Sequence, residues 1–192
     1  MKNIDISNKH IAIDIATQAF IDNPSMNWFL NKSENKHKAM KSLCEYCIDI
    51  AMKKSGAFIT DDLCCICLIN KSNARLSWLS ELRLNYFFIQ RCCGWINLWQ
   101  VLKRSKAMKK IRGHEEHLYA FLLASNLKNG NQSVLEAKSF MFEMSRQLQL
   151  PIYAETCLRK NKNIYLRYGF KPYTEWNIPN SSTVLWFLKK SV

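Results

Sequence analysis

A polar turn that opens a predicted helix contains the first residues able to bind an anion. The turn runs from Leu127 to Gln132, directly after an apolar segment, and includes Lys128 and Gly130. The first turn of a helix presents unpaired backbone N–H groups and the positive end of the helix dipole, which together suit phosphate. Gly130 lets the backbone approach a ligand closely, and Lys128 adds positive charge. Every loop before a helix shares this geometry, so the turn taken alone is explained equally well as a connection.

The second candidate for chemistry is Tyr165, which lies in the segment 161–170 together with Asn161. A phenolic hydroxyl can donate a proton. Taken alone, however, a tyrosine in this setting is an aromatic at a packing interface whose hydroxyl binds water. Tyr165 therefore acquires a chemical role only through its surroundings.

Eight cysteines raise the question of a metal site or a disulfide framework. Cys44 and Cys47 have the C-x-x-C spacing, but they lie on the apolar side of a predicted amphipathic helix. Cys64 and Cys67 have the same spacing but lie in a predicted strand, so we interpret neither pair as half of a zinc site. No apolar run at the start has the length of a secretory signal, so we expect a cytoplasmic protein with reduced, buried thiols and no metal.

The composition limits the class of protein. With 192 residues, 48% of them apolar and 22% charged, the chain can build one domain, 1–192, around its own core. No run of about 18 apolar residues exists, so we expect no membrane span. The 28 Lys and Arg exceed the 15 Asp and Glu, giving a net charge of +13. This excess favours nucleic acid, a membrane surface or a phosphate-bearing cofactor as partner. Nucleic acid ranks last because no recognised binding motif is present.

The positive charge is concentrated in one stretch, which we predict to be a solvated helix face and loop. Residues 101–112 contain six basic residues and no acidic ones: Lys103, Arg104, Lys106, Lys109, Lys110 and Arg112. Just before them, Trp95 and Trp99 lie one helical turn apart, a spacing typical of core residues. An amphipathic helix on a membrane surface is the alternative. Cys92, Cys93 and Gly94 argue against it because they give the helix no sharp polar face.

The elements that must position these residues alternate along the chain. Helices are predicted from Lys9 to about Phe20, from about Glu34 to Lys54, from Leu82 to about Lys110, and over 133–150 and 161–170. Residues 57–72 are predicted to form a β-hairpin that turns at Asp61 and Asp62. Further strands are predicted at 117–125, 151–157, 171–178 and 183–190.

The order of these elements predicts the fold class. A buried strand, a turn, a helix and a second strand form a βαβ unit, whose strands are parallel with a right-handed crossover. Gly169 is predicted to stop the short helix after it, in a left-handed conformation. We therefore predict an α/β fold whose mixed, mostly antiparallel sheet has a parallel βαβ pair at its centre and helices on both faces.

From His117 to Leu188 the sequence resembles the GNAT acyltransferase superfamily. The resemblance lies in HLYAFLLAS, the turn LKNGNQSVLEA, the strand PIYAETC, an Asn four residues before a Tyr (Asn161 and Tyr165), and the closing Gly169-Phe170. TVLWFLKK is also similar to the last strand of members that acylate small molecules, and AIDIATQAFIDNPSMNWFL to their opening helices. The resemblance implies an acyl-coenzyme A N-acyltransferase fold.

The turn departs from the family pattern, which reads Gln or Arg, two variable residues, Gly, a variable residue, then Gly or Ala. Those positions fall at Asn129, Gln132 and Val134, and Gly130 takes a variable slot. Backbone N–H donors survive a change of side chain, but Cβ atoms at Gln132 and Val134 crowd a phosphate or favour another path of the loop. Weakened or lost coenzyme A binding is therefore an open alternative.

The resemblance implies acetyl-coenzyme A as acyl donor and a small-molecule amine as acceptor. The strand 118–125, in particular Leu123, Ala124 and Ser125, is expected to bind the pantetheine arm, and one of its N–H groups to stabilise the oxyanion. The cofactor set then continues through the turn and the short helix: Lys128, Asn129, Gly130, Asn131, Gln132, Ser133, Val134, Asn161 and Tyr165.

Tyr165 is implied as the general acid that protonates the departing thiolate, since the pKa values of tyrosine and thiol differ by about two units. An amine must also lose a proton, and three residues remain open as the base: Glu116, His117 and Glu155. The basic aromatic stretch predicts acceptors that are neutral or acidic rather than polyamines. A non-catalytic GNAT-fold protein that binds a ligand or partner is the alternative function.

Overall fold

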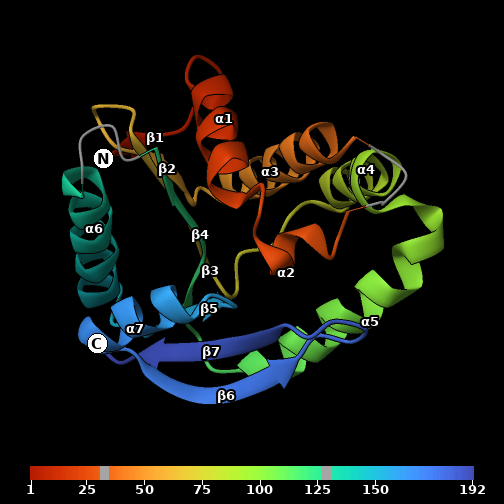
Figure 1. The fold of residues 1–192 in the computed structure, drawn as a ribbon. Coiled ribbons are helices and arrows are strands. Elements are labelled where there is room, and N and C mark those ends of the chain that lie inside the picture. Colours follow the sequence, from red (N-terminus) through yellow and green to blue (C-terminus); the bar gives the residue numbers. More distant parts are fainter. Residues whose placement is uncertain (31–34, 127–130) are drawn as a thin grey trace.

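The computed structural model of the protein describes residues 1–30, 35–126 and 131–192 (Figure 1). Its elements, in chain order, are β1 (Lys2–Asn3), α1 (Lys9–Phe20), α2 (Pro24–Asn27), α3 (Lys36–Lys53), β2 (Ala57–Ile59), β3 (Cys65–Lys71), α4 (Trp78–Phe88), the π-helical turn η1 (Ile89–Cys93), α5 (Gly94–Arg112), β4 (Leu118–Ser125), α6 (Gln132–Leu148), β5 (Ile152–Thr156), α7 (Arg159–Arg167), β6 (Lys171–Asn177) and β7 (Val184–Lys190).

The described strands form one seven-stranded sheet in the order β1-β2-β3-β4-β5-β7-β6. Strands β4 and β5 are parallel, and the other neighbouring pairs are antiparallel. The crossover between β4 and β5 contains α6, which is the βαβ unit predicted from the sequence. The predicted fold class, a mixed and mostly antiparallel sheet with a central parallel pair, is confirmed.

The parallel pair separates part-way along its length. Cα partners run from Leu118 with Ile152 to Ala120 with Ala154, and no further pair joins the two strands in the described chain. β4 continues to Ser125, paired there with β3. Beyond Ala120 the β5 side of β4 therefore lacks a strand partner, and space opens at the carboxyl ends of both strands.

Helices cover the two faces of the sheet with separate cores (Figure 1). On one face α1 and α3 pack on β2, β3 and β4, through buried residues such as Met40, Ile48 and Leu68. On the other face α6 packs on β3, β4 and β5, through buried Ala137 and Met141. The spacing of these apolar side chains matches the helical period, which is why the sequence alone located α3 and α6.

Most of the cysteines belong to these cores, as predicted. Six are buried, namely Cys44, Cys64, Cys65, Cys67, Cys92 and Cys93, while Cys47 and Cys157 are half-buried. All eight are free thiols. Burial raises the pKa of the Cys44 thiol to about 12, so this thiol stays protonated at neutral pH.

The predicted stop of α7 at Gly169 is also confirmed. Gly169 has a φ of +83°, the left-handed region that favours glycine. The N–H of Phe170 donates to the carbonyl of Tyr165 at 3.1 Å, which closes the helix end, and Phe170 is buried. The turn therefore fixes the orientation of α7, on which Asn161 and Tyr165 lie.

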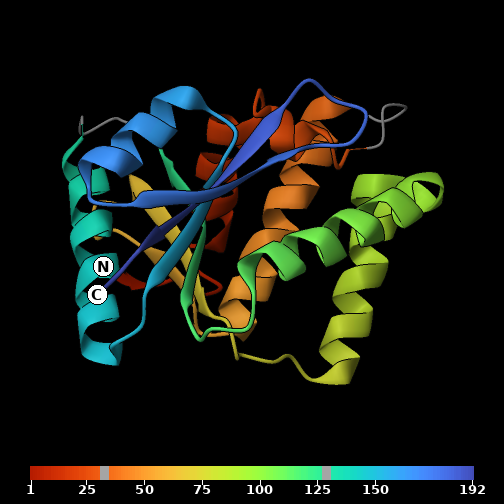
Figure 2. The ribbon, with the colours of Figure 1, turned by 90° about the horizontal axis from the view of Figure 1, so that it is seen from below.

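The long basic and aromatic segment differs from its prediction. The helix begins at Trp78, capped by the Ser77 hydroxyl, rather than at Leu82, and the turn η1 divides it into α4 and α5. The prediction that Trp95 and Trp99 are core residues is wrong, since they are 61% and 67% exposed. Their helical spacing is real, but α4 and the first half of α5 lie at one side of the molecule, away from the sheet (Figure 2).

In the part of the chain that the structure describes, no helix has the length and hydropathy needed to span a membrane. Among the same residues, no group of three or more His, Cys, Asp and Glu side chains is arranged to hold a metal ion.

Candidate active site

A cavity of about 210 Å³ lies where β4 and β5 separate. Its walls come from parts of the chain that are far apart in sequence: the end of α1 and the α2 region, α3, α5, β4, the end of β5, α7 and β7. Glu155 and Tyr165 both line it, together with Tyr119 and Leu123 of β4 and Asn161 of α7. The structure thus brings two of the predicted catalytic residues to one cavity.

Glu155 is a buried carboxylate at this cavity. Its side chain is 9% exposed, and its Oε1 atom lies 3.1 Å from Nε of Arg112. Burial raises the pKa of Glu155, while the Arg112 charge and a hydrogen bond from Tyr119 oppose that rise. Oε1 makes no well-aligned hydrogen bond within the described chain, so a lone pair remains for a further donor.

Tyr165 is half-buried, and its ring packs edge-on against Phe170 with centroids 5.0 Å apart. Burial, with a smaller contribution from Cys67, raises its pKa to about 12. The hydroxyl therefore carries its proton throughout the physiological range. Asn161, one helical turn earlier, is exposed and lines the same cavity.

The start of α6 presents backbone N–H groups of the kind that can bind an anion. The first-turn N–H groups of Gln132, Ser133 and Val134 have no backbone partner within the described residues, and Asn131 provides no side-chain cap. Such N–H groups together with the helix dipole bind phosphate. One feature opposes this: the Ser133 hydroxyl donates to Oδ2 of Asp62 at 2.6 Å, which places a carboxylate beside the same helix end.

The remaining predicted cofactor residues lie along β4 and in the turn. Leu123 lines the cavity, Ala124 is buried and Ser125 is half-buried at the end of the strand. The predicted positions Lys128, Asn129 and Gly130 lie outside the described residues.

The two other candidate bases lie elsewhere. Glu116 is exposed and accepts a hydrogen bond from the Asn73 amide at 3.2 Å. His117 is buried, stacks on Tyr153 with ring centroids 4.2 Å apart, and places Nδ1 2.7 Å from the carbonyl oxygen of Glu115. Burial lowers its pKa. Both precede β4, whereas the cavity is lined by residues 119–123 of this strand, and neither of the two is among the lining residues.

Sequence reasoning missed two arginines at the site. Within the stretch 101–112 the prediction of a solvated face fits the lysines, which are exposed, but is wrong for Arg104 and Arg112. Arg104 is only 2% exposed and lines the cavity, and Arg112 pairs with Glu155. A signal was present: Arg104, Met108 and Ile111 share the helical spacing of a face that packs inward.

Comparisons with known proteins place this architecture among solved structures. No protein-family model and no curated protein matches the sequence. The C-terminal condensation domain of Ebony, solved with beta-alanyl-dopamine, superposes with a TM-score of 0.68 at 10% identity, over 100% of this chain and 97% of that one. The Drosophila melanogaster polyamine N-acetyltransferase gives a TM-score of 0.67 at 7% identity, covering 100% and 98%.

A putative acetyltransferase of the GNAT family from Desulfovibrio desulfuricans superposes with a TM-score of 0.54 at 8% identity, covering 100% of this chain and 96% of that one. The chain has the GNAT fold. In this GNAT fold the separation of β4 and β5 and the cavity beside it are the features that can hold an extended ligand. Sequence identities as low as 7–10% establish similarity of fold only, so the roles of individual residues are argued from the geometry of the cavity.

Proposed function

We propose that the protein transfers an acyl group from acyl-coenzyme A, with acetyl-coenzyme A as the natural donor, to a small-molecule amine. The observation that carries this proposal is the cavity where β4 and β5 separate, because it has a buried carboxylate, Glu155, and a protonated phenol, Tyr165, in its walls. The proteins of similar fold support it, since they include a polyamine N-acetyltransferase, an agmatine N-acetyltransferase and a mosquito protein described as arylalkylamine N-acetyltransferase-like.

The chain's own residues would hold the donor in two places. The N–H groups of Gln132, Ser133 and Val134 would bind the diphosphate. The backbone of β4 around Leu123, which has no strand partner on its β5 side in the described chain, would bind the pantetheine arm. The bound thioester supplies the activated acyl carbon, and a β4 N–H would stabilise the oxyanion that forms on it.

Glu155 is proposed as the base. A protonated amine gives one proton to the Glu155 carboxylate, whose raised pKa makes it a stronger base than an exposed glutamate. The amine nitrogen then forms the new C–N bond while the C–S bond breaks. The nitrogen loses its second proton to solvent, and the Tyr165 hydroxyl protonates the departing sulfur. Glu155 then releases its proton to solvent, and Tyr165 takes one proton back from solvent. The overall change yields the amide, the free thiol and one proton.

The pKa of Tyr165, about 12, is high for a general acid. Removal from water would also raise the pKa of the departing thiol. A thiolate in this cavity is therefore a much stronger base than one in water, and the two pKa values approach each other.

The direct test is calorimetric titration with acetyl-coenzyme A, followed by a thiol-release assay on a panel of small amines. We expect saturable binding and amine-dependent release of the thiol. Binding without release for any amine would contradict the proposed enzyme.

A second function, a non-catalytic ligand-binding GNAT-fold protein, is favoured by one observation. The Asp62 carboxylate lies beside the start of α6, where it would repel a diphosphate, and Gln132 and Val134 replace the small residues of the family turn. No binding at millimolar acetyl-coenzyme A would favour this second function.

A further inference from the structure

We infer that the acceptor carries a carboxylate as well as the amine, so that the substrates are amino acids or related amino-carboxylic acids, held by Arg104 and Glu155. This inference rests on the proposed acyl transfer and names its acceptor class. It is based on one buried guanidinium in the cavity wall, that of Arg104, which forms no ion pair with any acidic residue that the structure describes.

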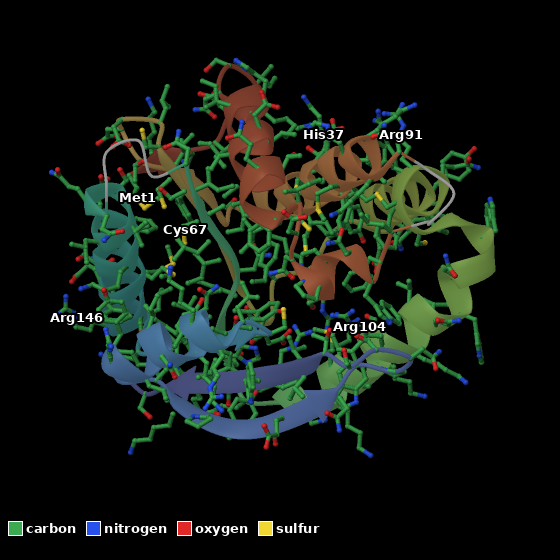
Figure 3. The ribbon with its side chains drawn as sticks, in the orientation of Figure 1. Met1, His37, Cys67, Arg91, Arg104 and Arg146 are labelled. Carbon is green, nitrogen blue, oxygen red and sulfur yellow. The ribbon has the colours of Figure 1, made fainter. Side chains whose placement is uncertain are left out.

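Arg104 is held in a fixed orientation from α5 (Figure 3). Its Nη1 donates to the Ser25 carbonyl at 3.2 Å and its Nη2 to the Ser25 hydroxyl at 2.6 Å. Its guanidinium lies over the rings of Phe29 and Trp28, with distances of 4.2 Å and 4.7 Å to the ring centroids. These contacts, with Ser25 of α2 and with the two aromatic residues that follow this helix, leave the side chain little freedom.

The contacts of Arg104 leave part of its binding capacity unused. The Nε–H has no hydrogen-bond partner in the described part of the chain, although the residue is 2% exposed. Nε–H and one hydrogen of Nη2 form an edge that binds a carboxylate through two parallel hydrogen bonds. Because Arg104 lines the cavity, a carboxylate on a bound acceptor can meet this edge.

The charges around the cavity also favour an acceptor that carries a negative group. Arg112 is paired with Glu155, whereas Arg104 and Glu155 form no ion pair with each other among the described residues. A buried cation without a counter-ion is costly, and burial lowers the pKa of Arg104 to about 10, which still leaves it charged at neutral pH. A simple amine or a polyamine would add positive charge. A carboxylate on the acceptor would neutralise the Arg104 charge.

The acceptor would then span two fixed groups of opposite charge. Its ammonium would meet Oε1 of Glu155, the atom that lacks a well-aligned hydrogen bond, and its carboxylate would meet Arg104. Glu155 and Arg104 lie near enough for each charge to act on the pKa of the other. The inference follows from this pairing of two incompletely satisfied, oppositely charged groups at one cavity.

The test compares matched acceptors that differ only in the carboxylate. Wild-type protein is assayed with acetyl-coenzyme A and three pairs: phenylalanine and phenethylamine, histidine and histamine, and arginine and agmatine. For the amino acid that is used best of the three, we expect kcat/KM to exceed that of the matched decarboxylated amine by about 10- to 100-fold. This is the range expected for hydrogen bonds to charged groups. Equal or better use of all three decarboxylated amines would overturn the inference while leaving the proposed function intact.

Two variants connect the preference to Arg104. Arg104→Lys keeps the positive charge but loses the pair of N–H donors that can bind a carboxylate in a bidentate way. Arg104→Met removes both the charge and the donors. Each should raise KM for the acid by about tenfold or more and leave KM for the matched amine within about twofold. Lys103→Met, one residue away on an exposed part of α5, is the control and should change neither. Urea unfolding shows whether Arg104→Met folds, and Arg104→Lys serves if it does not.

Calorimetry separates failure of the inference from failure of the proposed function. The wild-type protein is titrated with phenylalanine and with phenethylamine in the absence of a donor. Selective binding of phenylalanine without any turnover would support the acceptor site and count against the transferase. Turnover of amines with no discrimination between the pairs would support the transferase and overturn the carboxylate site. If the protein neither binds nor turns over any of the three acids, the inference is overturned.

Discussion

Nε of Arg112 and Oε1 of Glu155 lie 3.1 Å apart, joining the end of α5 to the end of β5 beside the cavity. Both side chains are mostly buried, and the Arg112 guanidinium also lies over the Tyr119 ring at 4.2 Å from the centroid. The pair keeps the carboxylate in place. The residual cost of its burial leaves its pKa above the usual glutamate range.

Glu155→Gln should lower kcat by about 10²- to 10⁴-fold, the usual contribution of a general base. Removing this charge also leaves Arg112 without its acidic partner and should destabilise the fold by about 2 kcal/mol, less than for a wholly buried pair. Thiol-release kinetics and urea unfolding measure the two effects. Glu116→Gln and His117→Asn are the matched controls from the other candidate bases. A larger rate loss in either control than in Glu155→Gln would move the role of base away from Glu155.

The pH dependence of the rate should report Glu155 directly. A base acts when deprotonated, so kcat/KM should fall as pH decreases through the pKa of Glu155, and burial puts that midpoint above the ordinary value of 4.5. Glu155→Gln should lose this acidic limb. The measurement is a pH–rate profile for both proteins with one acceptor, and an identical acidic limb in the two profiles would exclude Glu155 as its source.

Tyr165→Phe should lower kcat by about 10²-fold or more and leave the affinity for acetyl-coenzyme A nearly unchanged, because it removes one hydroxyl and keeps the ring on Phe170. Steady-state kinetics and calorimetry provide the two readouts. Tyr168→Phe, in the residue that follows α7, is the control, since Tyr168 does not line the cavity. An unchanged kcat would remove Tyr165 from the role of acid.

Gln132→Gly combined with Val134→Gly should tighten binding of coenzyme A if the two side chains obstruct the diphosphate. Each glycine also costs about 1 kcal/mol of helix stability, so unfolding is measured in parallel. Ser139→Gly with Gln147→Gly, two exposed positions farther along α6, should reproduce the stability loss with no gain in affinity. Unchanged affinity in the first pair would mean that the native turn already follows the path a diphosphate needs.

Gly56→Ala should destabilise the fold by about 3 kcal/mol. Gly56 follows α3 in the chain, and a Cβ atom there would collide with the carbonyl oxygen of Ile69 and with Oδ1 of Asn70. Gly113→Ala is the comparison: its φ of +74° strains the backbone, yet no described atom lies within 4 Å of the added carbon, so about 1 kcal/mol is expected. Urea unfolding of the two variants compares steric overlap with backbone strain, and equal losses would contradict this account.

Local patterns in the sequence predicted many of the helices and strands. The helical spacing of apolar residues located α3 and α6, and Gly169 marked the end of α7, because both signals depend on neighbours within a few residues. The order of strand, helix and strand then required a parallel pair at β4 and β5. The same local spacing misled at Trp95 and Trp99, since a helical face does not reveal whether anything packs against it.

The candidate site needed more than local patterns. The sequence named Glu116, His117 and Glu155 as equal candidates, and Glu155 alone of the three lines the cavity with Tyr165, because β4 and β5 separate only after Ala120 and Ala154. Arg104 looked like one more charge on a basic face, yet it is buried against α2, about 80 residues earlier in the chain. Periodicity along the chain determined which elements form, whereas burial and charge pairing at the site arise from contacts between distant segments, which only the tertiary structure decides.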